Sequence, residues 1–331
     1  MPSKQKKIRV GFIGCGGIAR GHFMRMSAIP QVEIVALNDT SPKSIERLIE
    51  RCPQAAGLPV YSDYKEMLDK VPLDAVEIAT PHTLHFEQAM AALDHDLHVL
   101  LEKPMVCSVA HAKALMKKAE EKGKVVQISY QRHFGGAYRY VREAIARGEI
   151  GPVHFVTAQQ SQEWYKSQQG AWRQSLALSG GGQLNDSGSH LLDIVLWMTD
   201  LVPAEVFAYI DNLDTEVDIL TAMSVKFDNG ALATFSVVGH STLWWEDVSI
   251  WGDQGAFFIR NGGAFFMNKK GETTELTGKI KDAGNPDANF VDAILGKDEV
   301  QVPPVCGLRV IQLTEAAWES GRTGKPAKVK K

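Results

Sequence analysis

The 331-residue sequence lacks the features that mark several classes of protein. Its early apolar stretch, Ile8 to Ile13, is interrupted by Arg9 and leads into glycines, so it predicts neither a signal-peptide core nor a membrane span. Only four cysteines occur, without any CxxC pair, which fits neither a disulfide framework nor a zinc knuckle. We therefore expect a cytoplasmic protein with reduced thiols, no membrane partner and no bound metal.

The sequence also lacks an excess of charge of either sign. Its 36 Lys and Arg residues nearly balance 39 Asp and Glu residues, which gives a formal net charge of -3. This balance leaves no electrostatic footprint for nucleic acid, so no such partner is expected. No internal repeat or low-complexity segment is present. A globular composition at this length predicts two domains.

Short apolar runs alternate with helical patterns over residues 1–130. The alternation indicates βαβ units, in which helices connect the strands of a parallel sheet. Ser41-Pro42 predicts the start of one helix, and Ser108 to Lys122 predicts another that ends at Gly123. The first domain, residues 1–130, is therefore predicted to be a doubly wound α/β domain of the nucleotide-binding type. Its strands are expected at Ile8–Ile13, Val32–Leu37, Ala75–Ala79, Leu97–Leu101 and Val125–Ile128.

From residue 131 onward the pattern changes. A helix over Ala137–Arg147 is followed by strands without helices between them, and Asp228-Asn229-Gly230 predicts a hairpin turn. The apolar spacing from Leu308 to Ala317 predicts a closing helix before Gly321. The second domain, residues 131–331, is therefore predicted to be α+β with an open, mostly antiparallel sheet. Its strands are expected at Val153–Gln159, Ala204–Ile210, Leu220–Phe227, Ala231–Val238, Asp247–Trp251 and Ala256–Ile259.

A glycine-rich loop follows the first strand and precedes a helix. Its G-x-G-x-x-A spacing places Gly14 at the tight turn and Gly16 where backbone N–H groups approach a pyrophosphate, and Ala19 lets the helix pack closely on the strand. Gly17 and Ile18 belong to the same predicted loop. The sequence therefore predicts a dinucleotide cofactor at this position.

Asp39 closes the second predicted strand, about 20 residues after Ala19. A carboxylate there can accept hydrogen bonds from the adenosine ribose and repels a 2′-phosphate. No arginine follows Asp39 directly, so NAD is expected in preference to NADP. Asp39 is also placed to cap the helix that begins at Ser41-Pro42, and the two roles are compatible.

Two polar segments, Ala79–His82 and Glu102–Pro104, follow apolar strands at the carboxyl edge, where open α/β sheets bind ligands. Pro104 restricts Lys103 to an extended backbone, so its ammonium is held at a fixed place above the edge. We therefore expect Lys103 to take part in the chemistry. The residues expected to line the cofactor site at this edge are Thr80, Pro81, His82, His85, Glu102 and Lys103.

Three glycines open the segment Gly180–Met198, which predicts a buried helix. On a helix, Asp186, His190 and Asp193 share one narrow polar stripe. An unpartnered buried polar group costs roughly 2–7 kcal/mol, so the stripe faces either internal partners or a wet pocket. The internal alternative is a core network in which one of the two carboxylates accepts from His190. Oxidation of a polyol favours the pocket, because Lys103, His190 and a carboxylate supply cation, base and orienting group.

These motifs resemble the Gfo/Idh/MocA oxidoreductases, which include inositol dehydrogenases and glucose-fructose oxidoreductases. Glu102-Lys103-Pro104 followed by Asp186 and His190 is the most specific part of a likeness that also includes residues 130–145 and 307–326. The resemblance implies an N-terminal Rossmann domain, a C-terminal domain with an open sheet, and a substrate between them. It also implies hydride transfer between NAD(P) and a hydroxyl carbon of a sugar, inositol or related polyol.

The same resemblance assigns roles to individual residues. Lys103 would contact the reacting hydroxyl, His190 would be the general acid/base, and Asp186 would bind a substrate hydroxyl. The division of proton transfer between Lys103 and His190 stays open. Apart from the resemblance, Arg132 is expected to contact the substrate. The stretch 159–173, with Trp164, Tyr165, Trp172 and Arg173, is expected to shape a sugar pocket, because aromatic side chains stack on sugar rings and arginine donates to hydroxyls. Members of the family commonly assemble through the outer face of the sheet, so a homodimer or homotetramer is expected.

Three other functions are weighed against this one. A glycosidase that uses NAD to oxidise, eliminate and re-reduce would release an aglycone without net NADH. A nucleotide sensor without catalysis would have no need of the whole polar constellation. A metal hydrolase built on His82, His85 and His190 is disfavoured, because an HExxH-type carboxylate pattern is missing.

Overall fold

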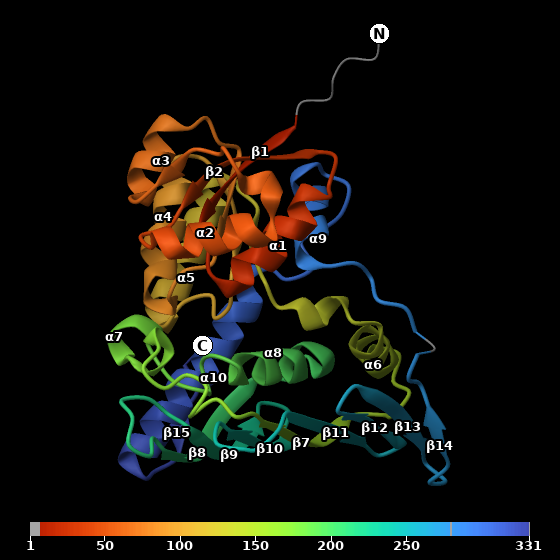
Figure 1. Ribbon diagram of the computed structural model, residues 1–331. Coiled ribbons are helices and arrows are strands. Elements are labelled where there is room, and N and C mark those ends of the chain that lie inside the picture. Colours follow the sequence, from red (N-terminus) through yellow and green to blue (C-terminus); the bar gives the residue numbers. More distant parts are fainter. Residues whose placement is uncertain (1–6, 279, 331) are drawn as a thin grey trace. The chain divides into compact units, whose positions relative to one another are not determined.

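Figure 1 shows the computed structural model, which describes residues 7–278 and 280–330. The chain divides into two compact units. Unit 1 contains the described residues up to Val106, with Ala110–Tyr130 and Gly284–Val305. Unit 2 contains the remaining described residues. The segment Gly284–Val305 lies beyond the predicted N-terminal domain, and the structure nevertheless places it in unit 1.

Unit 1 is built on a parallel sheet of six strands in the order β3-β2-β1-β4-β5-β6. This is the Rossmann strand order: successive strands are added on one side of β1 up to β3 and on its other side from β4 onward. The predicted fold class of this half is confirmed. The strands are β1 (Ile8–Ile13), β2 (Val32–Asn38), β3 (Val60–Tyr61), β4 (Ala75–Ile78), β5 (His98–Leu101) and β6 (Val126–Ile128).

Helices connect successive strands of unit 1. The side chain of Ser41 accepts a hydrogen bond from Ser44 N and so caps α2, as expected. Gly123 follows α5 with φ +58°, a left-handed conformation that ends the helix. The connecting helices are α1 (Gly17–Ser27), α2 (Pro42–Arg51), α3 (Tyr64–Lys70), α4 (His85–Asp94) and α5 (Val109–Lys122).

One more helix of unit 1 comes from much later in the chain. This helix, α9 (Pro286–Ile294), contacts α1, β5 and β6. Phe290 and Val291 are buried in the same core as Phe12 and Phe23. Burial of two apolar side chains in that core explains why Gly284–Val305 returns to unit 1.

Unit 2 is built on a nine-stranded sheet in the order β14-β13-β12-β11-β7-β10-β9-β8-β15. Of its described strand pairs, only β7 with β10 is parallel, which confirms the mostly antiparallel prediction. The expected hairpin turn at Asp228–Gly230 joins β9 to β10. The strands are β7 (Val153–Ser161), β8 (Pro203–Asp211), β9 (Leu220–Phe227), β10 (Leu232–Val238), β11 (Trp245–Gly252), β12 (Gly255–Arg260), β13 (Gly263–Asn268), β14 (Thr273–Glu275) and β15 (Ala327–Lys328).

Two helices, α6 (Gly136–Ala146) and α8 (Gly188–Thr199), lie over one face of this sheet (Figure 1). Along β9 and β10, buried side chains alternate with exposed ones, so the opposite face is open in the single chain. None of the described helices combines the length and the hydropathy needed to cross a membrane.

The closing helix is longer than predicted. This helix, α10 (Pro304–Thr323), continues past Gly321, where the sequence prediction ended it. A Cβ at Gly321 would lie 3.0 Å from the side chain of Ile210, so this glycine allows close packing on β8. The left-handed residue that ends the helix is Gly324, with φ +64°.

Candidate active site

The glycine loop of unit 1 has the geometry of a dinucleotide cradle. Gly14 has φ +92°, and a Cβ there would lie 2.7 Å from the carbonyl oxygen of Ala79. At Gly16 a Cβ would meet nothing within 4 Å, so the space beside it is open. The helix α1 begins at Gly17 without a side-chain cap and without an acidic residue in its first turn. Its free N–H groups therefore fit a pyrophosphate. Ile18 is 49% exposed at the same helix start.

Asp39 connects the end of β2 to the glycine loop. Its Oδ2 accepts from Cys15 N and its Oδ1 accepts from Ser41 N, both at 2.8 Å. Asp39 thereby supports the start of α2, while the side chain of Ser41 is the cap itself. The carboxylate is held at the strand end where a ribose would lie. Its contact with a ribose stays a prediction.

A buried histidine joins the two polar segments at the sheet edge. His85 Nδ1 lies 2.8 Å from the carbonyl oxygen of Pro104, and Nε2 lies 3.0 Å from that of Thr80. Burial lowers the pKa of His85 despite these contacts. His82 is buried beside it, with ring centroids 5.8 Å apart. His85 therefore has a clear structural role in this edge, and its predicted contact with the cofactor stays untested.

Lys103 follows β5 at the same edge and is half-buried. Its main-chain N–H donates to Oε2 of the buried Glu102 at 3.2 Å. The Lys103–Pro104 peptide bond is cis. Because β2, β1, β4 and β5 are neighbours in the sheet, their carboxyl ends bring the predicted cofactor residues of unit 1 to one edge. These residues are Gly14, Gly16, Gly17, Ile18, Asp39, Thr80, Pro81, His82, His85, Glu102 and Lys103.

In unit 2, Asp186 lies before the helix and not on it. The prediction placed Asp186 on one helical stripe with His190 and Asp193, but α8 begins only at Gly188. The preceding residues form turns, because the carboxylate of Asp218 accepts hydrogen bonds from the main-chain N–H groups of Gly182 and Leu184. His190 and Asp193 do lie on α8, so the polar segment is part turn and part helix.

Asp186 is held by two donors. The indole N–H of Trp164 and the Nε–H of Arg173 each lie 2.9 Å from its Oδ2. Trp164 is fully buried and Arg173 is partly exposed. The guanidinium of Arg173 also stacks 4.4 Å from the ring centre of Trp172, a predicted substrate residue. The structure thus brings Asp186 and the Trp172–Arg173 pair together within unit 2.

Asp193 takes part in an internal network. Its Oδ2 lies 2.8 Å from His133 Nε2, and the His133 ring packs against Trp197 with centroids 4.2 Å apart and an interplanar angle of 33°. Asp193 therefore has a partner inside the protein, but this partner is His133 and not the His190 of the internal alternative. Asp193, His133 and Cys306 also have their potential ligand atoms within 4.8 Å of one another. The nearby guanidiniums of Arg142 and Arg309 make the cluster a poor cation site.

Arg132, the remaining predicted substrate residue, lies in unit 2 and forms an ion pair with Glu246 of β11. The distance from Arg132 Nη2 to Glu246 Oε2 is 2.6 Å, and both side chains are largely buried. Tyr138 donates its hydroxyl to the other oxygen of Glu246. Arg132 thus has a structural partner, and its predicted contact with a substrate stays untested.

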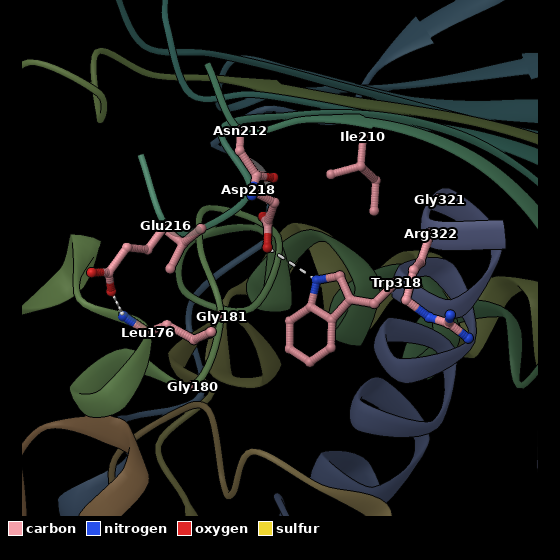
Figure 2. Close-up of a pocket in the computed structure, with 11 residues that line it drawn as sticks. Leu176, Gly180, Gly181, Ile210, Asn212, Glu216, Asp218, Trp318, Gly321 and Arg322 are labelled. Carbon is pink, nitrogen blue, oxygen red and sulfur yellow. Dashed lines mark hydrogen bonds between the residues drawn. The ribbon is translucent and has the colours of Figure 1, made fainter. Parts of the chain in front are cut away.

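The glycines before Asp186 serve close packing. A Cβ at Gly181 would lie 2.4 Å from the Trp318 ring, and one at Gly182 would lie 2.0 Å from the backbone of Asp218. The indole N–H of Trp318 donates to the carboxylate of Asp218 at 3.0 Å, and both residues line a pocket of about 310 Å³. Figure 2 shows this pocket. The described residues that line this pocket do not include Lys103, Asp186 or His190, so we do not assign the chemistry to it.

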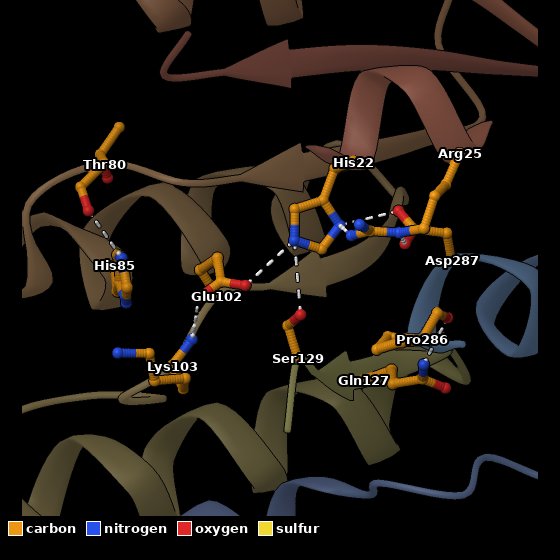
Figure 3. A network of polar contacts seen from close by, with 10 residues as sticks. All are labelled: His22, Arg25, Thr80, His85, Glu102, Lys103, Gln127, Ser129, Pro286 and Asp287. Atoms are coloured by element: carbon orange, nitrogen blue, oxygen red, sulfur yellow. Dashed lines mark hydrogen bonds and ion pairs between the residues drawn. The ribbon is translucent and has the colours of Figure 1, made fainter. Parts of the chain in front are cut away.

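Two residues of this site were not predicted from the sequence. His22 and Asp287 form part of a buried ionic network around Glu102, which Figure 3 shows. His22 comes shortly after Ala19, the last residue of the glycine motif, and this position could have marked it as a candidate site residue. Trp164 was expected to shape a sugar pocket, and the structure shows it buried as a donor to Asp186. Asp287 gave no local signal, because its partner is 265 positions away.

Comparison with known proteins identifies both halves of the chain. Residues 8–130 match the model described as "Oxidoreductase family, NAD-binding Rossmann fold", and residues 138–258 match the "GFO/IDH/MocA C-terminal domain". The scyllo-inositol 2-dehydrogenase (NAD(+)) of Bacillus subtilis is 23% identical over 286 residues, 82% of this chain and 80% of that protein.

Another relative is the 1-carboxy-3-chloro-3,4-dihydroxycyclo hexa-1,5-diene dehydrogenase of Comamonas testosteroni. It is 26% identical over 246 residues, which is 74% of this chain but only 61% of that protein. Among solved structures, the WlbA dehydrogenase of Bordetella pertussis in complex with NADH and UDP-GlcNAcA superposes with a TM-score of 0.84 at 22% identity, over 100% of both chains. At this identity the superposition establishes the fold alone.

Proposed function

Because the chain belongs to the Gfo/Idh/MocA family of oxidoreductases, we propose that it is an NAD(P)-dependent dehydrogenase acting on a ring hydroxyl. The substrate class is a sugar, inositol or related polyol, and a hydride passes between its hydroxyl carbon and the nicotinamide. The names of two relatives, a dihydroxycyclohexadiene dehydrogenase and an inositol dehydrogenase, describe ring substrates of this kind. The family match and these names support the proposal.

The observation that carries the proposal is the carboxyl edge of the parallel sheet. The open space beside Gly16, the uncapped start of α1 and the carboxylate of Asp39 have the shape and chemistry for a dinucleotide. Lys103 follows a strand at the same edge, so a cation lies on the side of the sheet where the nicotinamide would bind. When bound, the nicotinamide supplies a two-electron hydride acceptor.

The protein's residues bind the substrate and manage the proton. Lys103 donates a hydrogen bond to the reacting hydroxyl and stabilises the alkoxide character that develops there. His190 takes the hydroxyl proton during oxidation and returns it during reduction, with Lys103 sharing this task. Asp186, oriented by Trp164 and Arg173, accepts a hydrogen bond from another substrate hydroxyl. Trp172 offers a ring face for stacking on the substrate.

We propose NAD as the preferred cofactor. The carboxylate of Asp39 lies at the end of β2, where it suits the ribose hydroxyls and repels a 2′-phosphate. A homo-oligomer is also proposed, because Tyr209 and Leu232 are 72% and 47% exposed on strands of the open sheet. A cytoplasmic location remains a prediction from the sequence.

The test is NADH formation by the purified protein with NAD or NADP across a panel of inositols, aldoses, sugar acids and amino sugars. We expect turnover with one class of ring polyol. Lys103→Ala should lower kcat by about 10²- to 10⁴-fold, whereas Lys117→Ala should not change it. Lys117 is a suitable control because its side chain is 78% exposed and pairs with the surface residue Glu121.

The other outcomes identify the alternatives. Release of an aglycone without net NADH would indicate a redox-assisted glycosidase on the same scaffold. Cofactor binding without turnover of any substrate, in wild type and Lys103→Ala alike, would contradict the dehydrogenase and favour a nucleotide sensor.

A further inference from the structure

A buried histidine of α1 joins three segments of unit 1 (Figure 3). The side chain of His22 is 1% exposed. Its Nδ1 lies 2.7 Å from Asp287 Oδ1, and its Nε2 lies 3.0 Å from Glu102 Oε1. Asp287 belongs to α9 and Glu102 follows β5, so one ring connects the helix after the glycine loop to both of these segments.

Both ring nitrogens of His22 face a carboxylate oxygen. A neutral imidazole donates from one nitrogen only, so hydrogen bonds from both nitrogens to ionised carboxylates require the imidazolium form. Two other polar atoms lie farther from the ring nitrogens than these carboxylate oxygens do. Arg25 Nη2 is 3.2 Å from Nδ1, and Ser129 Oγ is 3.4 Å from Nε2. Burial alone lowers the pKa of His22, but the hydrogen bonds to Asp287 and Glu102 outweigh burial and raise the pKa to about 10.

The charges around His22 balance only when this histidine is positive. His22 and Arg25 are then the cations, and Asp287 and Glu102 are the anions. Glu77 of β4 is fully buried near them, and burial raises its pKa to about 8, so it holds its proton at neutral pH. A neutral His22 would therefore leave an uncompensated buried negative charge.

Glu102 connects His22 to the main chain of Lys103. Its Oε1 accepts from His22, and its Oε2 accepts from the main-chain N–H of Lys103. Burial tends to raise the pKa of Glu102, but the hydrogen bond from His22 reverses this effect and the pKa falls to about 2. Glu102 is therefore ionised at neutral pH, and both of its oxygens are used within the protein.

We propose that His22 is a positioning residue, a buried cation that orients Glu102 and thereby fixes the main chain from which the Lys103 ammonium extends. This rests on the proposed function, in which Lys103 contacts the reacting hydroxyl. Asp287 holds the other side of the ring, so α9 takes part in fixing the catalytic edge. Glu102 acts here as a link between two parts of the protein, in addition to its predicted place beside the cofactor.

The kinetic test compares His22→Gln with His95→Gln on the substrate that the panel identifies. Glutamine keeps hydrogen-bonding groups but carries no charge. In His22→Gln we expect kcat to fall about 10- to 100-fold through misplacement of Lys103, while the dissociation constant for NAD changes by less than about twofold. His95→Gln should leave kcat unchanged, because His95 is a surface histidine that contacts the carboxylate of Asp69.

The double variant His22→Gln/Glu102→Gln separates positioning from general damage. If His22 acts through Glu102, the double variant loses no more activity than Glu102→Gln alone. Losses that add, or an unchanged kcat in His22→Gln, would overturn the proposal.

Hydrogen exchange at the Lys103 amide gives a readout that needs no substrate. Exchange should be at least about tenfold faster in His22→Gln than in wild type or His95→Gln, because the Glu102 acceptor is no longer held. If exchange is faster but no substrate of the panel is turned over, the effect of His22 on the Lys103 main chain is supported and only the proposed function is contradicted. Unchanged exchange would overturn the positioning role.

If His22→Gln does not fold, nitrogen NMR of the wild-type histidines decides the matter. Two protonated ring nitrogens on His22 at about pH 8 support the buried cation. An unprotonated Nδ1, which would accept from Arg25, would overturn it.

Discussion

The indole N–H of Trp164 donates to the carboxylate of Asp186 across 2.9 Å, in a region where Trp164 is 1% exposed and Asp186 is 4% exposed. Arg173 donates to the same carboxylate oxygen from its partly exposed side. Two fixed donors on one oxygen set the orientation of this carboxylate before any ligand arrives, which is the preorganisation that a binding site for hydroxyl groups needs.

Removal of the indole donor should weaken this part of unit 2. In Trp164→Phe, the buried carboxylate of Asp186 loses one of its donors, so the free energy of unfolding should fall by about 2 kcal/mol. The KM for the polyol should rise as well, because Asp186 is less well oriented. Urea unfolding and steady-state kinetics measure the two effects. Trp245→Phe is the control, since Trp245 is 41% exposed and its change should be near zero.

The two glycines of the cofactor loop should respond differently to alanine. Gly14→Ala places a Cβ against the carbonyl of Ala79 in a left-handed conformation, so unfolding should become easier by at least about 2 kcal/mol. Gly16→Ala meets no protein atom, so stability is kept while the methyl group obstructs the pyrophosphate and NAD affinity falls at least about tenfold. Thermal unfolding with and without NAD separates these outcomes. Tight NAD binding by Gly16→Ala would contradict the proposed cradle.

Asp39 should control the choice of cofactor. Asp39→Ala removes the carboxylate beside the ribose site, so the preference for NAD over NADP should fall by about tenfold. Asp63→Ala is the matched control, because Asp63 also accepts a main-chain hydrogen bond at a helix start and its loss costs about 1 kcal/mol of stability. Binding titrations with both cofactors test the prediction. An equal effect of the two variants on the NAD/NADP ratio would show that Asp39 acts only as a structural residue.

Glu77 should make unfolding dependent on pH. Its pKa is raised by burial from the ordinary 4.5 to about 8, so between these values the folded protein holds a proton that the unfolded chain releases. The free energy of unfolding therefore falls as pH rises from about 4.5 to about 8. Glu77→Gln should remove this contribution and be more stable than wild type by on the order of 3 kcal/mol at pH 7.

The measurement is urea unfolding of wild type and Glu77→Gln at several pH values. The difference should vanish near pH 4 and grow until about pH 8. Glu46→Gln, at an exposed position of α2, should follow the wild type. A constant difference between Glu77→Gln and wild type at every pH would contradict the prediction.

The parallel sheet could be predicted closely because its information is local. Five of the six strands of unit 1 are short apolar runs separated by helical segments, and the predicted Ile8–Ile13 matches β1 to the residue. The antiparallel strands of unit 2 were also predicted where side chains alternate or a hairpin signal is present. Four strands, β3, β13, β14 and β15, were missed. Their pairing is set by neighbouring strands, because β14 and β15 are too short to show a pattern of their own.

Some residues of the candidate site are also marked by local sequence signals, and others are not. Gly14, Asp39 and Lys103 are marked by their place after a strand, which a sequence displays directly. The partners that hold the site are marked by nothing local. Asp287 contacts His22, which lies 265 positions away in the sequence. Asp186 lies outside the predicted helix because the carboxylate of Asp218 binds the main chain of the turns before α8. Long-range polar contacts of this kind depend on the folded topology and have no period or spacing.

The return of α9 to unit 1 has a consequence for the order in which the protein is made. Phe290 and Val291 complete an apolar core whose other buried members lie in the first half of the chain. A ribosome therefore releases all six parallel strands long before the helix that closes their core, and most of the nine-stranded sheet emerges in between. The N-terminal unit begins synthesis first but reaches its final packing near the end. A gene fragment cut after residue 130 would encode a sheet with part of its core left open.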